Sequence, residues 1–442
     1  MQPKRALSLF DSTCIIVGII VGAGIFETAP TVAGAMGTAA GILGIWLVGG
    51  LLALAGALCY AELATAYPHQ GGDYIYLSRA YGSWAGYLFG WSQLAIIRPG
   101  DIALMAFIFA RYAQTLYAPF PRAGMLYAVA AVVVLTTMNV MGVQEGKWTQ
   151  NLLTVAKTAG LLLIVAAGLV GPGGQSAPGG AGTITLGGVK LALILVMFTF
   201  GGWNEMAYVS AEVKCPEKNI VRALALGTAA VTVLYLCVNG AYLSVLGAEG
   251  MAASPAVAVD TVKPLLPDLA ARAVSVLICI SALGAVNGLV FTGARISYAM
   301  GADHPVFSRV GLWSERFGTP VWALVVQGAL SIAIIVVAGS FMDTILYTAP
   351  VVWMFFVATG ISVFVLRRSD PGTPRPFKVA GFPVTPVLFC AFAAFMLYSC
   401  VTYALAEKPL GLLVVSGVVI AGAVLYAATH CWGRGVRKVT GS

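Results

Sequence analysis

The chain has 442 residues, of which 59% are hydrophobic and 10% are charged, and its formal net charge is +8. Its mean hydropathy of +0.90 excludes an ordinary soluble domain, in which about a quarter of the residues are charged. The lysines and arginines are dispersed over separate loops. The positive net charge therefore gives no support for a nucleic-acid partner.

Apolar stretches fill nearly the whole sequence, and each is as long as a membrane-spanning helix, which needs about 20 residues. The sequence therefore predicts an all-α integral membrane protein, built as a single transmembrane domain over residues 1–442. The first span is too long for a cleaved signal peptide and leads directly into the second. Twelve spans are expected, at residues 9–35, 39–66, 83–116, 124–142, 149–171, 188–211, 221–246, 270–300, 319–339, 342–366, 384–405 and 409–429.

The distribution of lysine and arginine predicts the orientation. If the N-terminus is cytoplasmic, most basic residues fall in the tails and the inside loops, as the positive-inside rule requires. We therefore expect a multi-pass protein of the plasma or bacterial inner membrane, in contact with lipid and with both termini in the cytoplasm. Residues 67–81 are expected to form an interfacial helix or gate on the inside. Residues 171–188 should form a flexible external loop, and residues 249–268 should carry short external helices.

The first span is interrupted near its middle by small residues, in the stretch Ile20-Val21-Gly22-Ala23-Gly24-Ile25-Phe26. Lipid does not tolerate unpaired backbone groups, so a break at this depth is expected to line a cavity inside the protein. Gly22 and Gly24 leave N–H groups unshielded at the start of a half-helix, whose positive end attracts a carboxylate. Small residues that merely allow close helix packing are the alternative.

Charged residues also occur in the second and third spans. Glu62, at the inner end of the second span, is expected to pair with Arg79 or Arg295 as a cytoplasmic gate. Asp101 follows Arg98 by three residues, so an ion pair along the third span is expected. The alternative for Asp101 is a carboxylate that faces the cavity and receives a cationic side chain or a proton.

Lys157 is the only lysine expected deep inside a span. A charged side chain within the membrane is costly and marks a functional site unless it reaches the interface. Lys157 is expected about eight residues inside its span, which is too deep for its ammonium to reach the membrane interface. It can stay charged as a fixed brace, or it can titrate and couple the protein to protons, because burial lowers the proton affinity of an amine.

A second break lies in the sixth span, in Phe198-Thr199-Phe200-Gly201-Gly202-Trp203-Asn204. Glycine-interrupted segments at corresponding places in the two halves of a membrane protein predict the binding site of a transporter. The spans would then form two inverted repeats of five, at about residues 9–171 and 188–366, with the last two spans appended at 384–429. Glu205 directly follows the break and, like Asp101, could receive a cationic side chain or a proton.

These motifs resemble the amino acid–polyamine–organocation superfamily and, within it, the L-type amino acid transporter branch. The break of the first span resembles the helix 1 signature of the superfamily. The second break, followed by Glu212 through Arg222, resembles helix 6 of the L-type branch. Further matches occur in order along the chain, at Tyr60-Ala61-Glu62-Leu63, Ile97-Arg98-Pro99 and Gly284-Ala285-Val286-Asn287-Gly288 with Arg295.

The resemblance implies a leucine-transporter-like fold in which helices 1 and 6 are broken, and transport of amino acids, in many members by sodium-independent exchange. It implies that the N–H groups of Ala23 and Gly24 hold the substrate carboxylate. Many members have serine at the position of Ala23, so a hydroxyl contact is lost here. The carbonyls of Ile20, Phe198 and Gly201 would hold the ammonium, and Phe198 would cover the substrate from outside. The remaining implied site residues are Gly22, Ile25, Gly202, Trp203 and Asn204.

For Lys157, the resemblance implies a position where sodium lies in sodium-coupled relatives, bridging helix 1 carbonyls to helix 8 near Ser281. Sodium-independent exchange is then expected, with proton symport as the alternative. The apolar residues Phe198, Phe200 and Trp203, together with the expected pairing of Asp101, favour neutral amino acids over cationic ones. Eukaryotic L-type transporters bind a single-span glycoprotein through a cysteine between helices 3 and 4. Residues 117–124 contain no cysteine, so no disulfide-linked heavy chain is expected.

Other functional classes are less compatible with the sequence. The eight cysteines and three histidines show no metal-ligand spacing, so neither a metal site nor a cofactor is expected. An intramembrane enzyme would need a nucleophile and a base, and no convincing pair lies within the spans. A structural or receptor-like subunit would leave both helix breaks unexplained.

Overall fold

The computed structural model describes residues 5–118, 120, 123–170, 184–338, 341–407 and 409–440, and in these ranges it is helical and forms no strand. The elements of the first half are α1 (Leu9–Ile20), α2 (Gly24–Glu27), α3 (Ala29–Met36), α4 (Ala39–Ala66), α5 (Asp73–Tyr81), α6 (Ser83–Ser92), the π-helical turn η1 (Gln93–Ile97), α7 (Arg98–Leu116), α8 (Ala123–Met141) and α9 (Val143–Val170). Those of the second half are α10 (Leu186–Thr199), the 3₁₀ helix η2 (Glu205–Glu212), α11 (Pro216–Ala253), α12 (Val257–Val262), α13 (Ala270–Asp303), the 3₁₀ turn η3 (Pro305–Phe307), α14 (Val321–Ala338), α15 (Phe341–Ser369), α16 (Val384–Glu407) and α17 (Pro409–Thr440).

Each expected span coincides with one helix or with two or three consecutive helical elements. In the described ranges, ten of these helices are long and apolar enough to cross a membrane, and Leu186–Thr199 and Val321–Val336 are shorter apolar helices. Some bounds differ, because α9 begins six residues before the expected position 149 and α17 continues to Thr440. The chain is therefore a multi-pass membrane protein, whereas the count of twelve spans and the inverted repeat stay predictions.

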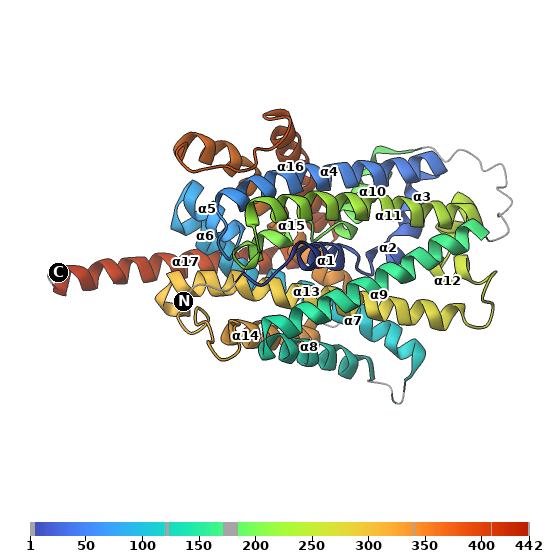
Figure 1. Ribbon diagram of the computed structural model, residues 1–442, viewed down its shortest axis with the longest axis horizontal. Helices are drawn as coiled ribbons and strands as arrows, with labels where there is room; N and C mark the ends of the chain where they lie inside the picture. Colours follow the sequence, from blue (N-terminus) through green and yellow to red (C-terminus); the bar gives the residue numbers. More distant parts are fainter. Residues whose placement is uncertain are drawn as a thin grey trace.

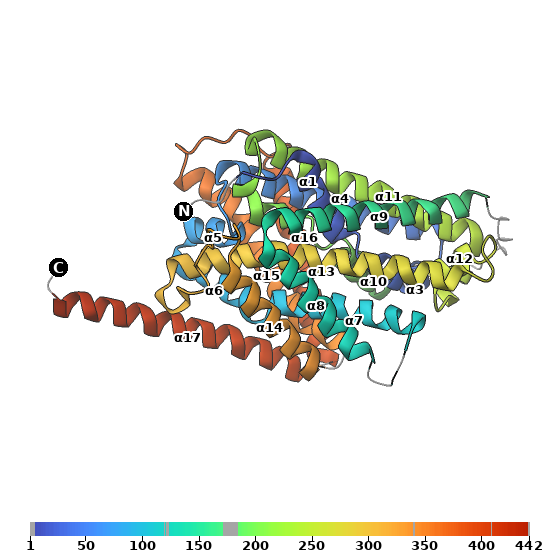
Figure 2. The ribbon, with the colours of Figure 1, turned by 60° about the horizontal axis from the view of Figure 1, so that its bottom comes forward.

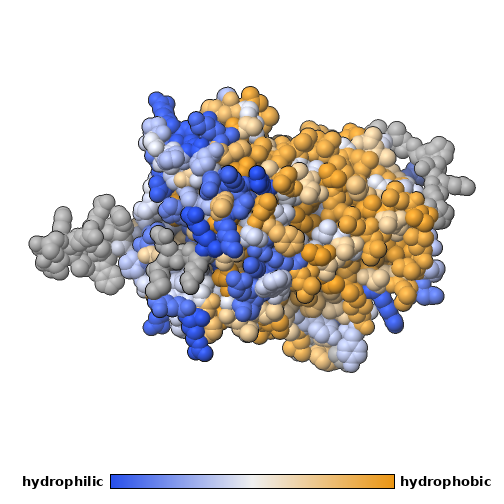
Figure 3. All heavy atoms as spheres, in the orientation of Figure 1, coloured by the Kyte–Doolittle hydropathy of each residue, from blue (hydrophilic) through white to orange (hydrophobic). Residues whose placement is uncertain are grey.

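The helices run along the long axis of an elongated bundle (Figures 1 and 2). The helix α5 and the end of α17 lie at one end of the bundle, and α3 and α12 lie at the other. Hydrophobic residues cover much of the face in Figure 3, and hydrophilic residues gather near the α5 end. This distribution suits a bundle whose middle faces lipid.

Two of the expected loop structures are present. The segment 67–81 contains the helix α5, and the segment 249–268 contains the short helix α12. Residues 171–183 of the expected flexible loop lie outside the described residues. The first described turn after them begins at Thr185, whose hydroxyl accepts a hydrogen bond from the Gly188 N–H at 3.0 Å and caps α10.

The broken first helix lies inside the bundle, where α1 packs against α9, α11 and α13. Its start is fixed by a capping box: the Ser8 hydroxyl accepts from the Asp11 N–H at 3.2 Å, and the Asp11 carboxylate accepts from the Ser8 N–H at 2.9 Å. Because Asp11 also accepts from Asn151 on α9 at 2.7 Å, the helix start is tied to its neighbour. This arrangement sets the depth at which α1 ends.

Candidate substrate site

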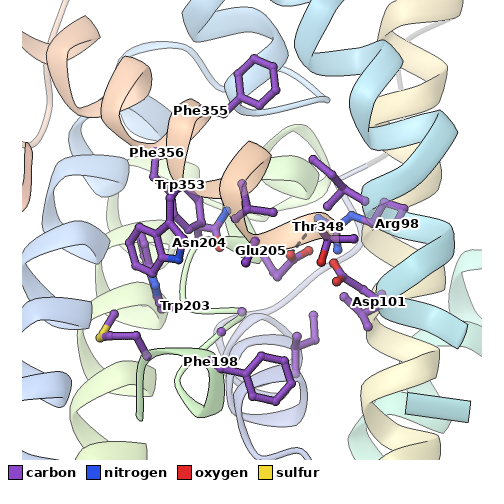
Figure 4. A pocket seen from close by; sticks show the side chains of 18 of the residues that line it. Arg98, Asp101, Phe198, Trp203, Asn204, Glu205, Thr348, Trp353, Phe355 and Phe356 are labelled. Atoms are coloured by element: carbon purple, nitrogen blue, oxygen red, sulfur yellow. Dashed lines mark hydrogen bonds and ion pairs between the residues drawn. The ribbon is translucent and has the colours of Figure 1, made fainter. Parts of the chain in front are cut away.

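A cavity of about 180 Å³ lies beside the broken helices, far larger than the roughly 10–15 Å³ that holds one water. Most of its wall is aromatic and aliphatic, and charged and polar groups gather on one side (Figure 4). Such a cavity is the default binding site of a protein. Its lining includes Ile19 of α1; Phe198, Gly201, Gly202, Trp203, Asn204, Glu205 and Tyr208 of the second break and η2; Arg98, Asp101 and Met105 of α7; and Thr348, Trp353, Phe355 and Phe356 of α15.

The second helix break supplies much of this wall. The helix α10 ends at Thr199, and the Gly201 N–H donates to the Phe198 carbonyl at 3.0 Å in the turn that follows. Gly202 has a φ of 109°, a conformation that side chains oppose. A Cβ atom there would also lie 2.5 Å from Ile19 Cγ2. Glycine is thus required both by the turn and by its contact with α1.

The first break is buried beside the cavity, and α1 contributes only Ile19 to the lining. The expected residues Ile20, Gly22, Ala23, Gly24 and Ile25 are all buried but do not line it. Met105 explains the separation, because it lines the cavity and its Cε atom lies 3.7 Å from where a Gly22 Cβ would be. The two breaks nevertheless touch, since a Cβ on Gly24 would lie 2.9 Å from Thr199 Oγ1.

A tyrosine that the sequence motifs did not single out joins the two breaks. The Tyr235 hydroxyl of α11 donates to the Ile20 carbonyl at 2.7 Å and lies 3.4 Å from the Thr199 carbonyl. The Ile20 carbonyl, expected to hold a substrate ammonium, is therefore already an acceptor. Phe200 packs against Trp46 and Tyr235 with ring centroids 6.1 and 5.2 Å away. It does not line the cavity, contrary to the apolar role expected for it.

Lys157 of α9 is completely buried among α1, α9 and α13. Its ammonium donates to the Gly18 carbonyl of α1 and to the Ser281 carbonyl of α13, the latter at 3.4 Å. The Ser281 hydroxyl donates to the Val21 carbonyl at 2.9 Å. A Cβ on Gly284 would lie 2.8 Å from Lys157 Nζ, so glycine leaves room for the amine. Lys157 thus has the neighbours that the resemblance implied.

The charged residues of the cavity lining, Arg98, Asp101 and Glu205, correct the expectation that Arg98 pairs with Asp101. Arg98 Nη2 lies 2.7 Å from Glu205 Oε1, and Thr292 donates to Glu205 Oε2 at 2.6 Å. Arg98 therefore pairs with Glu205 and not with Asp101. Its long side chain reaches across to η2 and lies over the Tyr208 ring at 5.1 Å, which a rule for neighbours on one helix does not anticipate. In the described part of the chain, Asp101 makes no hydrogen bond or ion pair.

Aromatic side chains of α15 form a part of the site that sequence reasoning missed. In Figure 4, Trp203, Trp353 and Phe356 lie on one side of the cavity, Arg98 and Asp101 lie on the other, and Glu205 lies between them. The Trp203 and Phe356 rings are 5.2 Å apart. The only available signal was Pro350 within an aromatic stretch of α15. A proline in a membrane helix does not by itself specify a site.

The expected cytoplasmic gate pairs also differ. Glu62 accepts from Arg367 at 2.7 and 2.6 Å and from the Val379 N–H at 2.6 Å, so it binds neither Arg79 nor Arg295. The segment after α15 folds back over α4, which helix order alone does not reveal. Arg295 instead donates to Glu212 at 2.8 and 3.2 Å, and Arg79 lies 4.0 Å from Asp370. Among the described residues, no group of three potential ligands for a metal ion occurs.

Comparison with known proteins identifies relatives. A family model described as amino acid permease matches residues 7–420. The chain is 32% identical to b(0,+)-type amino acid transporter 1 of Mus musculus over 399 residues, and this aligned region covers 88% of this chain and 82% of the mouse protein. The human protein of that name is 31% identical, over 89% and 82% of the two chains. Large neutral amino acids transporter small subunit 2 of Mus musculus is 33% identical, over 88% and 75%.

Proposed function

The chain belongs to the amino acid permease family, and from that premise we propose that it exchanges amino acids across the membrane without sodium. The relatives reported above are amino acid transporters by name. The observation that carries the proposal is a cavity within a helical bundle, bordered by the Gly201-Gly202 turn of one broken helix and by Ile19 at the end of another. Alternating access around such a site is the working principle of transporters with broken helices.

Backbone groups at the two breaks would hold the zwitterionic part of the substrate. The first N–H groups of a helix have no partner within it, so Ala23 and Gly24 can donate to a carboxylate. The Gly201 carbonyl can accept from an ammonium, and so can the Phe198 carbonyl, which already accepts from the Gly201 N–H but has a second lone pair. Met105 would have to turn aside to admit the carboxylate, because it lies between the cavity and Gly22. Phe198 would cover the bound substrate.

The position of Lys157 supports the proposed sodium independence. A fixed ammonium that donates to carbonyls of α1 and α13 occupies a place where a metal cation would need the same oxygens. Two positive charges cannot share these ligands at the short distances involved. A lysine that changes protonation during the cycle would instead give proton symport, the alternative to exchange. Because residues 117–124 contain no cysteine, we propose that the transporter works without a disulfide-linked partner.

Side-chain selectivity has two candidates. Trp203, Phe198 and Phe356 give the cavity an apolar wall that suits neutral amino acids. A specific observation favours cationic amino acids as the second candidate, because Asp101 faces the cavity while Arg98 is neutralised by Glu205. The formal charges of Arg98, Asp101 and Glu205 in the lining then leave one negative charge without a cation. Aromatic faces also attract cations.

Thermal stabilisation of the purified protein in detergent tests the proposal, because a ligand that binds only the folded state raises the unfolding temperature. Each of leucine, alanine, arginine and glutamate would be added in turn, with the matching D-amino acids as controls. We expect at least one neutral or cationic L-amino acid to stabilise the protein in a sodium-free buffer. Stabilisation by none of them, or only in the presence of sodium, would overturn the proposed function.

A further inference from the structure

Asp73 begins α5 and is almost completely buried, with 1% of its surface exposed. Its Oδ1 atom accepts hydrogen bonds from the Tyr60 hydroxyl of α4 and the Thr359 hydroxyl of α15. The Tyr208 hydroxyl of η2 is directed at the same carboxylate. Oδ2 has no hydrogen-bond partner among the described residues. Three separate elements therefore meet at one carboxyl group.

Among the fully buried acids of the described residues, Asp73 alone lacks a cation; Asp101, which also has none, is only half-buried and faces the cavity. Asp11 lies 3.3 Å from Lys147, and each of the three buried glutamates has an arginine within 2.8 Å, in the pairs Glu62–Arg367, Glu205–Arg98 and Glu212–Arg295. In the described ranges, no lysine or arginine lies within 4.0 Å of Asp73. The titratable groups that face it are Tyr60 of α4, Tyr208 and Glu205 of η2, and Tyr76 of its own helix, while α15 presents the neutral Thr359.

Enclosure without a cation favours the neutral form of a carboxyl group, because ionisation in a dry environment is costly. Burial raises the pKa of Asp73 to about 6, and the hydroxyl donors limit the rise. The helix α5 is not one of the candidate membrane spans. If α5 moved away and water reached the carboxylate, its pKa would return toward the ordinary value of about 3.9. The closed arrangement therefore binds a proton more tightly than an open one.

The segment that contains Asp73 is attached to η2, whose residues Glu205 and Tyr208 line the cavity. The Gly71 N–H donates to the Tyr208 carbonyl at 3.1 Å, and the Ser210 hydroxyl donates to the His69 carbonyl at 2.9 Å. The Gln70 side chain donates to Glu212 at 2.9 Å. The loop before α5 is thus bonded to η2 along its length. The lysine and arginine distribution assigns the α5 end of the bundle to the cytoplasm.

The Tyr208 side chain lies between Asp73 and the cavity. Asn204 and Tyr208 both line it, and Asn204 Nδ2 donates to the Tyr208 hydroxyl at 2.7 Å. The Tyr60 ring packs edge-on against Trp203, with centroids 5.1 Å apart. A proton on Asp73 would turn the carboxyl group that Tyr208 faces from an acceptor into a donor, while the Tyr208 hydroxyl already accepts from Asn204. The protonation state of Asp73 therefore acts on a residue that lines the cavity.

We propose that Asp73 is a proton-binding site that controls a cytoplasmic gate formed by residues 67–81: it holds a proton while this segment is bonded to η2 and α15, and it releases the proton to water when the segment moves away. The proton comes from water and returns to water, and no other bond changes. By linkage, low pH favours the closed gate, and opening is accompanied by proton release. The inference rests on the proposed function, because it treats the cavity as the amino acid site.

Hydrogen–deuterium exchange of residues 67–81 in the purified full chain measures gate opening without any substrate. Expressed as protection factors, wild-type protection at pH 5 should exceed that at pH 7.5 by about tenfold, as pKa values of about 6 closed and about 3.9 open require. Asp73→Asn, which is always neutral, should show the same high protection at both pH values. Asp303→Asn is the matched control, because Asp303 is exposed and also accepts from a tyrosine of α5, Tyr74, at 2.7 Å. This variant should keep the pH dependence.

A second variant keeps the test decisive if Asp73→Asn fails to fold. Thr359→Val removes one donor to the charged carboxylate, so the midpoint of the pH dependence should move to higher pH. An unmoved midpoint, or pH-independent protection in the wild type, overturns the inference. Uptake of leucine, alanine and arginine into liposomes at both pH values separates this failure from failure of the proposed function. If none is taken up, the proposal of amino acid transport fails, while the hydrogen–deuterium exchange of residues 67–81 still decides the role of Asp73.

Discussion

Buried charges in this protein differ in how they are neutralised, and that difference sets what each can do. Arg98 and Glu205 form a close pair at 2.7 Å, with Thr292 bonded to the second carboxylate oxygen. A pair enclosed in this way is fixed in position, because separating it leaves two charges in a dry environment. Asp101 has no such partner and faces the cavity, so its charge remains available to a ligand.

Removing Arg98 should destabilise the protein strongly. Arg98→Met leaves Glu205 buried without its cation, which costs about 3–5 kcal/mol. The double variant Arg98→Met with Glu205→Leu should recover much of that loss, because no unpaired charge remains. The free energy of unfolding in mixed detergent micelles measures the effect. Arg111→Met is the control, because Arg111 is largely exposed where it pairs with Glu27, and it should cost less than about 1 kcal/mol. Equal losses for the two single variants would contradict this account of the buried pair.

Asp101 should decide the order of affinities between cationic and neutral substrates. A hydrogen bond to a charged group contributes about 1.5–3 kcal/mol, so Asp101→Asn should weaken arginine binding at least about tenfold relative to leucine. Competition against a labelled amino acid on the purified protein measures both. Glu217→Gln, an exposed change at the start of α11, should leave the order intact. An Asp101→Asn protein with unchanged arginine affinity would remove Asp101 from the site and favour neutral substrates.

The two broken helices act as one structural unit, because each break is packed into the other. Gly202 lies against Ile19, and Gly24 lies against Thr199. Tyr235 hydrogen-bonds the Ile20 carbonyl at the end of α1, while Lys157 and Ser281 bind the Gly18 and Val21 carbonyls. Free carbonyls at a helix end are costly in a dry environment unless bonded. These side chains therefore supply donors to the carbonyls at the end of α1.

Gly24→Val should abolish amino acid binding by forcing the breaks apart. The new Cβ would lie 2.9 Å from Thr199 Oγ1 and 3.2 Å from Thr199 Cα, so backbone has to move, at a cost of about 1–3 kcal/mol. Binding and monodispersity in detergent are measured together. Gly44→Val is matched to it, since a Cβ on Gly44 meets nothing within 4 Å, and it should bind normally. Normal binding by Gly24→Val would place the site elsewhere.

Lys157→Ala should insert into the membrane but transport amino acids poorly. The change leaves the Gly18 carbonyl without its donor and loosens α1 from α9 and α13. Transport rates into liposomes would be compared with those of Lys190→Ala, because Lys190 is near the start of α10, its ammonium lies over the Tyr398 ring at 5.5 Å, and it does not line the cavity. We expect the first variant alone to be impaired. Unimpaired transport would show that this lysine has no role in the cycle.

Across the whole chain, the helices were predictable and many of their side-chain partners were not. The lengths of the hydrophobic stretches predicted every expected span at the position of a helix, because the thickness of the lipid bilayer sets the length of a membrane-spanning helix. Glycine located the breaks, since Gly202 adopts a conformation that side chains oppose. The partners of Arg98 and Glu62 were predicted wrongly because long side chains reach helices that are distant in sequence. The aromatic wall of α15 was missed, since apolar residues in a span look alike whether they face lipid or a cavity.

Counterflow in sodium-free liposomes tests amino acid exchange most directly. The purified protein would be reconstituted, the vesicles loaded with unlabelled leucine or arginine, and uptake of the same labelled amino acid followed in choline buffer. We expect rapid uptake that depends on the internal amino acid and does not rise when sodium replaces choline. Empty vesicles and the Lys157→Ala protein should show little uptake. Uptake that requires sodium, or the absence of amino acid uptake by a folded protein, would contradict the account.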